Sequence, residues 1–207
     1  MHTLCAGCVL CHSGVTGVSM LALFYAVLTY LVCSIPTGSI LAALYADVDL
    51  RDHGSGNIGA TNAARVLGKG IGAATLVGDL AKGLLMTLGA SAVSDAGWYP
   101  GVIAGCAFLG HCFSAYLNFR GGKGVATTAG ALLVLAPWPT VLTMGAWGLV
   151  VGVTRKSSLG ALTAVFVLPL LVAWMRPSHA LIALLLAFGV AVRHADNVKR
   201  ILAGTER

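Results

Sequence analysis

Long runs without a charged residue constrain this chain more than any other feature of its sequence. Val18 to Leu44 contains 27 consecutive uncharged residues, and Val125 to Thr154 contains 30. A helix needs about 20 mainly apolar residues to cross the hydrocarbon core of a bilayer. The chain is also 57% apolar and only 10% charged, whereas a soluble domain is about a quarter charged. We therefore expect an all-α integral membrane protein, which excludes a soluble catalytic domain.

Four further segments are apolar enough to be spans: Gly70 to about Ser94, Trp98 to Phe119, Ser157 to Met175, and Pro177 to Val192. The first of them is interrupted by Asp79 and Lys82, which stand three residues apart. Residues at this spacing share one face of a helix, and charged side chains within a membrane are expected to pair away from lipid. The sequence therefore predicts an internal ion pair here.

The run from Val125 to Thr154 carries Pro137-Trp138-Pro139 near its centre, so it could be one kinked span or two short ones. The rule that basic residues stay on the cytoplasmic side decides between them. With a turn at the prolines, eleven of the thirteen Lys and Arg residues fall on one side. A single long span would move Arg155 and Lys156 to the other side. We predict a seven-transmembrane-helix bundle with the N-terminus outside and the C-terminus cytoplasmic.

Residues 1–19 contain the run Cys5-x-x-Cys8-x-x-Cys11-His12, whose spacing is similar to that of a metal or iron–sulfur cluster motif. Four ligands within eight residues, with no second pair elsewhere, cannot enclose a metal inside a folded module. The segment also lacks the basic n-region and the cleavage site of a signal peptide. We expect residues 1–19 to be an N-terminal extension that is not part of the fold.

The first loop expected on the inside runs from Arg51 to Lys69 and is rich in glycine and in hydrogen-bond donors. Its glycines allow sharp turns that aim backbone N–H groups at one point, an arrangement that suits phosphate. Glycine and asparagine alone would equally indicate a tight turn, but the hydroxyls and the arginine favour anion binding. The candidate phosphate-binding residues of this loop are Ser55, Gly56, Asn57, Thr61, Asn62 and Arg65.

Three more basic loops are expected on the same side. In the second, Gly121, Gly122 and Gly124 surround Lys123. Topological anchoring would explain the lysine but not the glycines, so Gly121, Gly122 and Lys123 are candidate phosphate-binding residues. The third includes Ser158, and the fourth runs from Arg193 to Arg200. Basic, hydroxyl and amide groups at the mouth of an apolar bundle predict a substrate with a phosphate at one end and a hydrocarbon tail at the other. The net charge of +6 then indicates anionic lipid or substrate rather than nucleic acid.

Two histidines lie near these loops. We expect His111, within the third span, to be a hydrogen-bonded core residue. His194 stands three residues before Asn197, so the two could share a helical face, and we expect a functional role for it. Nothing in the sequence has the spacing of a multi-aspartate metal site or of a Ser-His-Asp triad. We therefore expect no metal and no cofactor.

The order of these motifs resembles that of the bacterial membrane acyl-phosphate:glycerol-3-phosphate acyltransferase family. The match covers Met20 to Arg207, so residues 20–207 are expected to form a single transmembrane acyltransferase domain. Its landmarks are Ser34-Ile35-Pro36-Thr37-Gly38, Gly54 to Asn62 with Arg65, Asp79 with Lys82-Gly83, Gly110-His111, Gly121 to Thr127, Ser158, His194 with Asn197 and Arg200, and Gly204-Thr205-Glu206. Cys33 and Ser114 depart from the family pattern and are expected to affect only helix packing.

The resemblance implies seven transmembrane helices and no metal. It also implies transfer of a fatty acyl group from acyl phosphate to the 1-hydroxyl of glycerol 3-phosphate, giving lysophosphatidic acid and phosphate as the first step of phospholipid synthesis. By the same resemblance, Ser55, Arg65, Lys123, Ser158, His194 and Asn197 match substrate-binding and catalytic positions. The expected location is the bacterial inner membrane, with the active site on the cytoplasmic face. The soluble enzyme that makes acyl phosphate is an expected partner.

An acyl phosphate is a mixed anhydride that is already activated for attack, so positioning and charge stabilisation suffice for transfer. We expect the first loop to hold the acyl phosphate, and Lys123, Arg65, Ser158 and His194 to hold glycerol 3-phosphate. Asn197 would orient the reacting centre. The general base is either His194 or a substrate phosphate, whose second pKa is near 6. The rival class, a small anion or lipid transporter, predicts basic residues along a path through the bilayer.

Overall fold

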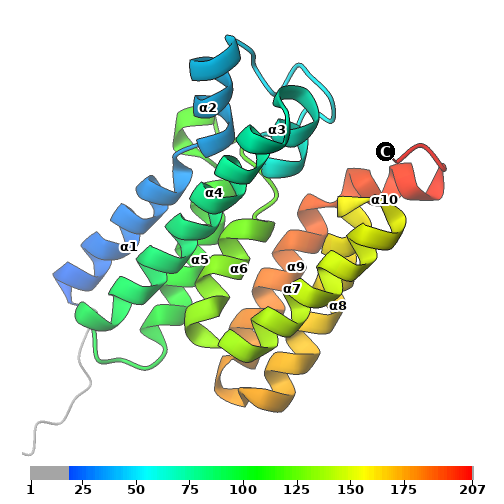
Figure 1. The fold of residues 1–207 in the computed structure, drawn as a ribbon. Coiled ribbons are helices and arrows are strands. Elements are labelled where there is room, and N and C mark those ends of the chain that lie inside the picture. Colours follow the sequence, from blue (N-terminus) through cyan, green and yellow to red (C-terminus); the bar gives the residue numbers. More distant parts are fainter. Residues whose placement is uncertain (1–18, 207) are drawn as a thin grey trace, which may run out of the picture.

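The computed structural model describes residues 19–206 as a bundle of helices (Figure 1). Residues 1–18, which contain the Cys5 to His12 run and most of the expected extension, lie outside the described residues. The α-helices are α1 (Met20–Ser34), α2 (Thr37–Ala46), α3 (Ala60–Leu67), α4 (Lys69–Gly89), α5 (Tyr99–Cys112), α6 (Val125–Leu135), α7 (Pro137–Thr154), α8 (Ser157–Met175), α9 (Ala180–Arg193) and α10 (Ala195–Leu202). Three 3₁₀ turns are Ala90–Ala92, Ala115–Leu117 and Pro177–His179.

The first apolar run, Val18 to Leu44, is long enough for one span, and in the structure it contains a break. Helix α1 begins at an N-cap, because the Ser19 hydroxyl accepts a hydrogen bond from Ala22 N at 3.1 Å. It ends at Ser34, and Pro36 separates it from α2. Proline has no N–H to donate to the preceding helical turn, and the proline ring clashes with a carbonyl group of that turn. The two helices still form one apolar stretch of 27 residues, Met20–Ala46, as long as a membrane span.

The turn predicted at Pro137 is confirmed. Helix α6 stops at Leu135, Ala136 takes an extended φ of −146°, and α7 begins at Pro137. Proline is well tolerated in the first turn of a helix, where its missing N–H has no intrahelical partner. The run from Val125 to Thr154 therefore makes two helices, and α6 has only 11 residues.

By length and composition, four helical stretches of the described residues could each cross a membrane. A fifth is the pair Pro177–Arg193 and Ala195–Leu202, bent by 55° at His194. The third predicted span corresponds to the candidate span Tyr99–Leu117. Within it, α5 ends at Cys112 and the 3₁₀ turn Ala115–Leu117 follows. The chain then turns back, so that Gly122 N donates to the His111 carbonyl at 3.0 Å.

The bundle is consistent with a membrane environment. Large apolar side chains point outward along its sides, for example Phe24, Leu149, Phe166 and Leu181, each at least 64% exposed. The expected internal ion pair is confirmed: Lys82 Nζ lies 2.9 Å from Asp79 Oδ1, and both side chains are at most 8% exposed. The protein is thus all-helical, with its charges kept from the outer surface of the spans.

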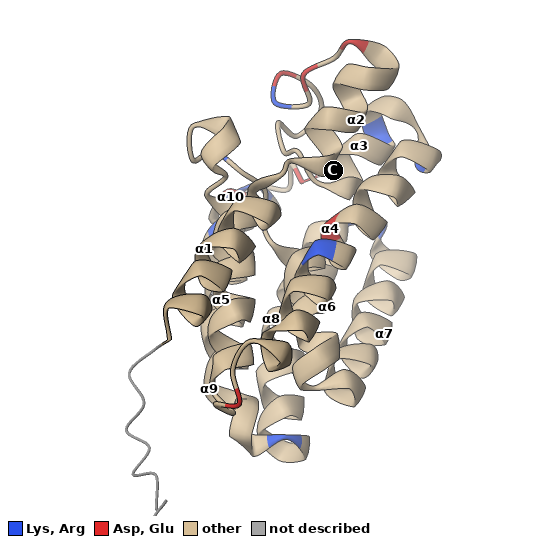
Figure 2. Ribbon diagram, turned by 90° about the vertical axis from the view of Figure 1, so that its left-hand side faces the viewer, with Lys and Arg blue, Asp and Glu red and all other residues tan. Residues whose placement is uncertain are grey.

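The four basic loops meet at one end of the molecule, as expected. Figure 1 shows α2, α3 and α10 at this end, together with the start of α6 and the turn between α7 and α8. Figure 2 shows that Lys and Arg are concentrated toward the same end, although Lys82 lies within α4 and Arg176 at the opposite end. The opposite end carries the start of α1 and the turns between α4 and α5, α6 and α7, and α8 and α9. Successive spans therefore bring polar segments far apart in the sequence to one place.

Candidate active site

A polar cavity of about 240 Å³ lies where three of the basic loops meet. Its walls come from the first loop, from the glycine-rich second loop, and from the bend between α9 and α10. The lining residues are Ser55, Gly56, Asn57, Gly121, Lys123, Val192, Arg193, Ala195, Asp196, Asn197 and Arg200. Five of the residues predicted from the sequence to bind substrate or phosphate thus share one cavity with the predicted catalytic Asn197.

A chain of hydrogen bonds fixes the side chains of this cavity. Lys123 Nζ donates to Asn197 Oδ1 at 2.5 Å, and Asn197 Nδ2 donates to Glu206 Oε1 at 2.7 Å. Arg200 Nε donates to the other carboxylate oxygen of Glu206 at 2.7 Å. Both Asn197 and Glu206 are buried. The Asn197 amide is oriented by its hydrogen bond to the Glu206 carboxylate. Lys123 is therefore held at the cavity wall by a neutral amide oxygen, and not by direct contact with a carboxylate.

The third predicted loop joins this chain of hydrogen bonds through Ser158. The Ser158 hydroxyl is buried, and it has no hydrogen-bond partner of good geometry among the described residues. It nevertheless lies close enough to Glu206 to affect the carboxylate. Burial raises the pKa of Glu206, but the nearby Ser158 hydroxyl and the hydrogen bonds from Asn197 and Arg200 outweigh it, so that the pKa is lowered from its ordinary value. Glu206 is therefore a carboxylate at neutral pH.

Lys123 sits in a strongly cationic setting. Burial, followed by repulsion from Arg200, lowers the pKa of Lys123 from its ordinary value to about 8, although Glu206 raises it. A lysine with this pKa is mostly protonated at neutral pH and becomes neutral only above pH 8. A bound phosphate would place a negative charge in contact with this ammonium group, which otherwise contacts the neutral Asn197 amide oxygen.

His194 lies at the bend between α9 and α10 and is only 3% exposed. Its Nδ1 is 2.8 Å from the Val190 carbonyl. A carbonyl can only accept, so this contact assigns the proton to Nδ1 and leaves Nε2 as an acceptor. Burial, with the positive charge of Lys123 adding to it, lowers the pKa of His194 to about 4. The imidazole is neutral at physiological pH. It does not line the cavity described above.

The first loop is folded around the side chain of Asn62. Asn62 Oδ1 accepts from Ser55 N at 2.8 Å, and its Nδ2 donates to the carbonyls of Leu50 at 3.1 Å and His53 at 2.9 Å. Asn62 is 1% exposed, so in this structure it shapes the loop from within. Gly56 takes a left-handed φ of +71°, which costs glycine less than other residues. The loop is thereby held open toward the cavity at Ser55.

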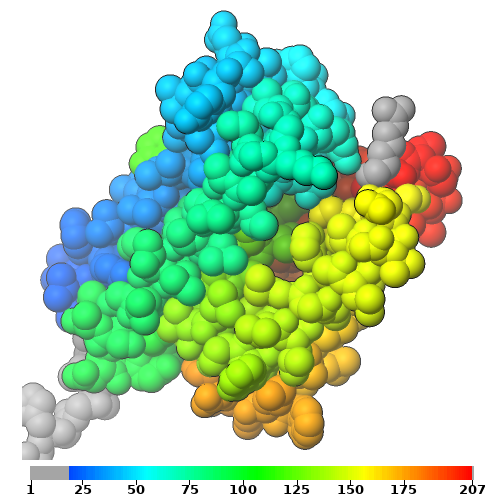
Figure 3. Space-filling model, in the orientation of Figure 1, coloured from blue at the N-terminus to red at the C-terminus, as the bar shows by residue number. Residues whose placement is uncertain are grey.

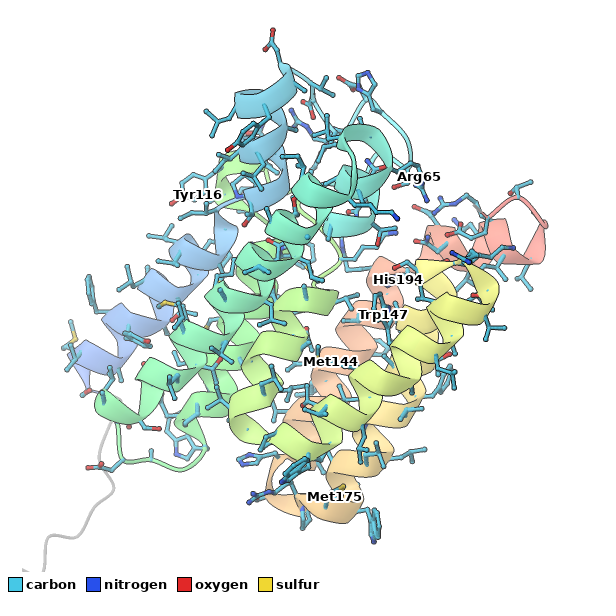
Figure 4. The ribbon with its side chains drawn as sticks, viewed as in Figure 1. Arg65, Tyr116, Met144, Trp147, Met175 and His194 are labelled. Atoms are coloured by element: carbon cyan, nitrogen blue, oxygen red, sulfur yellow. The ribbon has the colours of Figure 1, made fainter. Side chains whose placement is uncertain are left out.

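Two other predicted residues of the first loop lie on α3. The Thr61 hydroxyl donates to Ser157 Oγ at 3.0 Å and so ties α3 to the start of α8. Arg65 is exposed on the next turn. Figure 4 shows Arg65 on α3 and His194 at the bend between α9 and α10, at the same end of the bundle. Neither Thr61 nor Arg65 lines the cavity in this structure.

The second loop is held by Arg193, which the sequence did not single out as a site residue. Arg193 Nη2 donates to the Gly121 carbonyl at 2.9 Å and its Nε to the Gly122 carbonyl at 3.0 Å. The guanidinium group also lies 5.6 Å from the centre of the Phe113 ring. Arg193 thus fixes the backbone immediately before Lys123. Every residue has a main-chain carbonyl, so the sequence cannot indicate which carbonyls an arginine side chain will bind.

Glu206 and Arg200 are further site residues not selected as such from the sequence, although both stand among the landmarks of the family resemblance, Arg200 with His194 and Asn197, and Glu206 with Gly204 and Thr205. Asp196 also lines the cavity. Among residues 19–206, no group of three or more His, Cys, Asp and Glu side chains is placed to hold a metal ion. Apart from the acidic Asp196, the side chains with charge or donors around the cavity are cationic, amide or hydroxyl groups, which fit an anion.

An apolar pocket lies beside the polar cavity, between α6, α7, α8 and α9. It has a volume of about 60 Å³. Its lining includes Val125 and Val190, each two residues from a residue that lines the polar cavity, and further down Met144 and Leu168. In the space-filling view of Figure 3 the surface is hollowed between the green and the yellow segments, and Figure 4 labels Met144 on α7. A polar cavity therefore adjoins an apolar pocket.

A helical membrane bundle with this pair of sites has the features of an enzyme that acts on phosphate-bearing lipids. Comparison with known proteins agrees. The family model of glycerol-3-phosphate acyltransferase matches residues 23–204. The glycerol-3-phosphate acyltransferase of Syntrophotalea carbinolica is 43% identical over 88% of this chain and 96% of its own length. That of Pseudomonas savastanoi pv. phaseolicola is 46% identical over 91% of this chain and 99% of its own length.

Solved structures support the same conclusion. The crystal structure of PlsY, an integral membrane glycerol 3-phosphate acyltransferase, in its glycerol 3-phosphate form has a TM-score of 0.85 at 32% identity. It covers 90% of this chain and 94% of that chain. The lysophosphatidic acid form has a TM-score of 0.83 at 31% identity, with the same coverage. The chain belongs to the glycerol-3-phosphate acyltransferase family. It is an integral membrane acyltransferase of phospholipid synthesis, so the family resemblance of its motifs is confirmed.

Proposed function

We propose that this protein transfers a fatty acyl group from acyl phosphate to the 1-hydroxyl of glycerol 3-phosphate, giving lysophosphatidic acid and phosphate. The observation that carries the proposal is the Lys123–Asn197 contact in a polar cavity whose walls come from three loops, beside an apolar pocket. The family assignment supports the acyltransferase reaction. The choice of acyl phosphate as the donor rests on its chemistry: it is a mixed anhydride that is already activated for attack, so positioning and charge stabilisation suffice.

Glycerol 3-phosphate is proposed to bind with its phosphate at Lys123 and with Arg65, Ser158 and His194 around the rest of the molecule. Lys123 is a compact cation that three glycines leave accessible, which suits a small phosphate. The first loop, at Ser55, Gly56 and Asn57, would hold the phosphate of the acyl donor through backbone N–H and side-chain donors. Within it, Asn62 positions the loop and Thr61 ties it to α8. The two anionic groups would thus occupy adjacent walls of one cavity.

The reaction needs no covalent enzyme intermediate. The 1-hydroxyl oxygen attacks the acyl carbonyl carbon, the carbon–oxygen bond to phosphate breaks, and phosphate leaves with that electron pair. Asn197, oriented by Glu206, would orient the reacting centre. The hydroxyl proton must go to a base. A pKa of about 4 makes His194 a weak base, whereas a phosphate has a second pKa near 6. We therefore assign the role of base to a substrate phosphate. His194 Nε2 would accept a hydrogen bond from a hydroxyl group of glycerol 3-phosphate.

The acyl chain would occupy the apolar pocket between α6 and α9. Val125 follows Lys123 by two residues, so a chain that enters there would have its activated carbonyl near the cavity. The transporter alternative requires charged groups along a path through the bundle. Among the described spans, the charged side chains away from the ends are only Asp79 and Lys82, and they form one compact pair rather than a path.

The proposed topology has seven spans formed by α1 with α2, α4, α5, α6, α7, α8 and α9. The N-terminus would lie outside and the C-terminus in the cytoplasm, because basic residues favour the cytoplasmic side. The cavity would then open on the cytoplasmic face of the bacterial inner membrane, where a soluble enzyme could deliver acyl phosphate. Helix α6 is about 17 Å long at 1.5 Å per residue, so the membrane would be thinned beside it or α6 would borrow length from its flanks.

The direct experiment is to assay the purified full chain with acyl phosphate and glycerol 3-phosphate. We expect lysophosphatidic acid and inorganic phosphate in a one-to-one ratio. Acyl-CoA offered in place of acyl phosphate should give no product. Lysophosphatidic acid from acyl-CoA alone would contradict the proposed donor, and release of phosphate without acylated product would contradict transfer.

A further inference from the structure

Beneath the second loop lies a cluster of three buried ionisable side chains that the proposed reaction does not use. Asp79 and Lys82 of α4 and His111 of α5 are 3%, 8% and 5% exposed. His111 Nδ1 lies 3.6 Å from Asp79 Oδ1 and has no hydrogen-bond partner among the described residues. The expected burial of His111 is confirmed, whereas the hydrogen bond expected for its ring is missing at Nδ1.

The cluster joins several elements of the bundle. Lys82 Nζ pairs with Asp79 and also donates to the Ile35 carbonyl at 3.0 Å. Ile35 stands at the break between α1 and α2. Next to it, the Ser114 hydroxyl donates to the Ser34 carbonyl at 2.6 Å. Asp79 and Lys82 of α4 are therefore held against His111 of α5 and against the break that follows α1.

The imidazole of His111 also touches the loop that carries Lys123. Gly122 N and Gly121 N donate to the carbonyls of His111 and Cys112, at 3.0 and 3.1 Å. The Cα of Gly122 faces the imidazole so closely that an added methyl group would collide with His111 Nε2. From the other side, Arg193 binds the carbonyls of Gly121 and Gly122. The loop backbone is thus clamped between Arg193 and the His111 ring, one residue before Lys123.

We propose that the Asp79–Lys82–His111 cluster is a positioning site for the glycerol 3-phosphate loop: it holds the His111 ring against Gly122 and so sets where the Lys123 ammonium lies. A buried ion pair adds little net stability, because the desolvation of both charges offsets their attraction, but it can fix one geometry. This inference rests on the proposed binding of glycerol 3-phosphate at Lys123.

The test is a double-mutant cycle between His111 and Gly122, with the kinetic constants of both substrates as the readout. Gly122→Ala alone should raise the KM for glycerol 3-phosphate at least ten-fold, because its methyl group collides with the ring. In the His111→Ala background the same change should cost less than three-fold, because the ring is gone. The KM for acyl phosphate should stay within three-fold in all variants.

An equal cost of Gly122→Ala in both backgrounds would overturn the proposal, while activity of the unmodified protein separately tests the proposed function. A second variant tests the ion pair without leaving a lone buried charge: Asp79→Asn/Lys82→Met should raise the KM for glycerol 3-phosphate by three-fold or more. The matched control is Thr87→Val, a buried residue further along α4, which should leave that KM unchanged. If Asp79→Asn/Lys82→Met and Thr87→Val both raise the KM for glycerol 3-phosphate in proportion to the thermal stability that each loses, the cluster serves folding alone and the proposal is overturned.

Discussion

Lys123 and Asn197 are 74 residues apart in the chain, yet the lysine ammonium donates to the asparagine side-chain oxygen at 2.5 Å. The contact joins the start of α6 to α10. Because the amide nitrogen of Asn197 is in turn bound by Glu206, the amide cannot flip without losing both partners. Lys123 thus donates to Asn197, and Asn197 donates to Glu206; this fixed direction of the hydrogen bonds leads to the first prediction.

Asn197→Asp should lower kcat/KM for glycerol 3-phosphate by roughly 10- to 100-fold, because loss of a hydrogen bond to a charged group costs about 1.5–3 kcal/mol. The new carboxylate would face Glu206 with no donor between them. The pair Asn197→Asp/Glu206→Gln restores one amide and one carboxylate with their positions exchanged, and should recover most of the activity. Steady-state kinetics of the two variants check this; a double variant no better than Asn197→Asp would contradict the assigned direction of the hydrogen bonds.

Arg193→Lys should raise the KM for glycerol 3-phosphate by roughly 10-fold, because lysine cannot reach the carbonyls of Gly121 and Gly122 together and does not stack on Phe113 in the same way. Each lost hydrogen bond to a charged donor is worth about 1.5 kcal/mol or more. Arg120→Lys, in the same loop, is the matched control and should have little effect. Equal kinetics for both variants would show that the clamp on the loop does not affect binding.

The activity should fall on the alkaline side as Lys123 loses its proton. The ammonium form, which attracts phosphate, is present below the pKa of about 8 and is lost as pH rises through it. A profile of kcat/KM against pH should therefore decline above pH 8. In Lys123→Arg this limb should disappear, because arginine stays charged. His194, with a pKa of about 4, should add no limb near pH 6.5. An unchanged alkaline limb in Lys123→Arg would assign the titration to another group.

The two ends of the bundle should lie on opposite sides of the membrane. A cysteine placed at Arg155, between α7 and α8, should react with an impermeant maleimide only after the cells are opened. One placed at Asp95, between α4 and α5, should react in intact cells. The native cysteines are replaced by alanine or serine in both proteins. Labelling of the residue 155 position from outside intact cells would contradict the seven-span topology.

Much of this architecture could be predicted from the sequence. Uncharged runs mark helices that must lie in lipid, and the spacing of Asp79 and Lys82 marks a pair on one face. The end of α5 at Cys112 could not be predicted, because it depends on hydrogen bonds between the second loop and the α5 carbonyls. The role of Asn62 was equally hidden, since an asparagine that shapes a loop and one that binds a ligand look the same in sequence. Arg193 acts on main-chain carbonyls, which carry no sequence signal.

The central claim is that the Lys123 cavity binds glycerol 3-phosphate, and equilibrium binding of the radiolabelled compound to the purified chain tests it most directly. The unmodified protein should bind it saturably, and Lys123→Met should weaken binding by roughly 10-fold or more, as expected for loss of a charge-assisted contact. Lys199→Met is the matched control: the Lys199 side chain is 78% exposed, pairs with Asp196 on the surface of α10 and does not line the cavity, so its loss should not change the affinity. Equal affinity of the Lys123→Met variant and the unmodified protein would contradict the account.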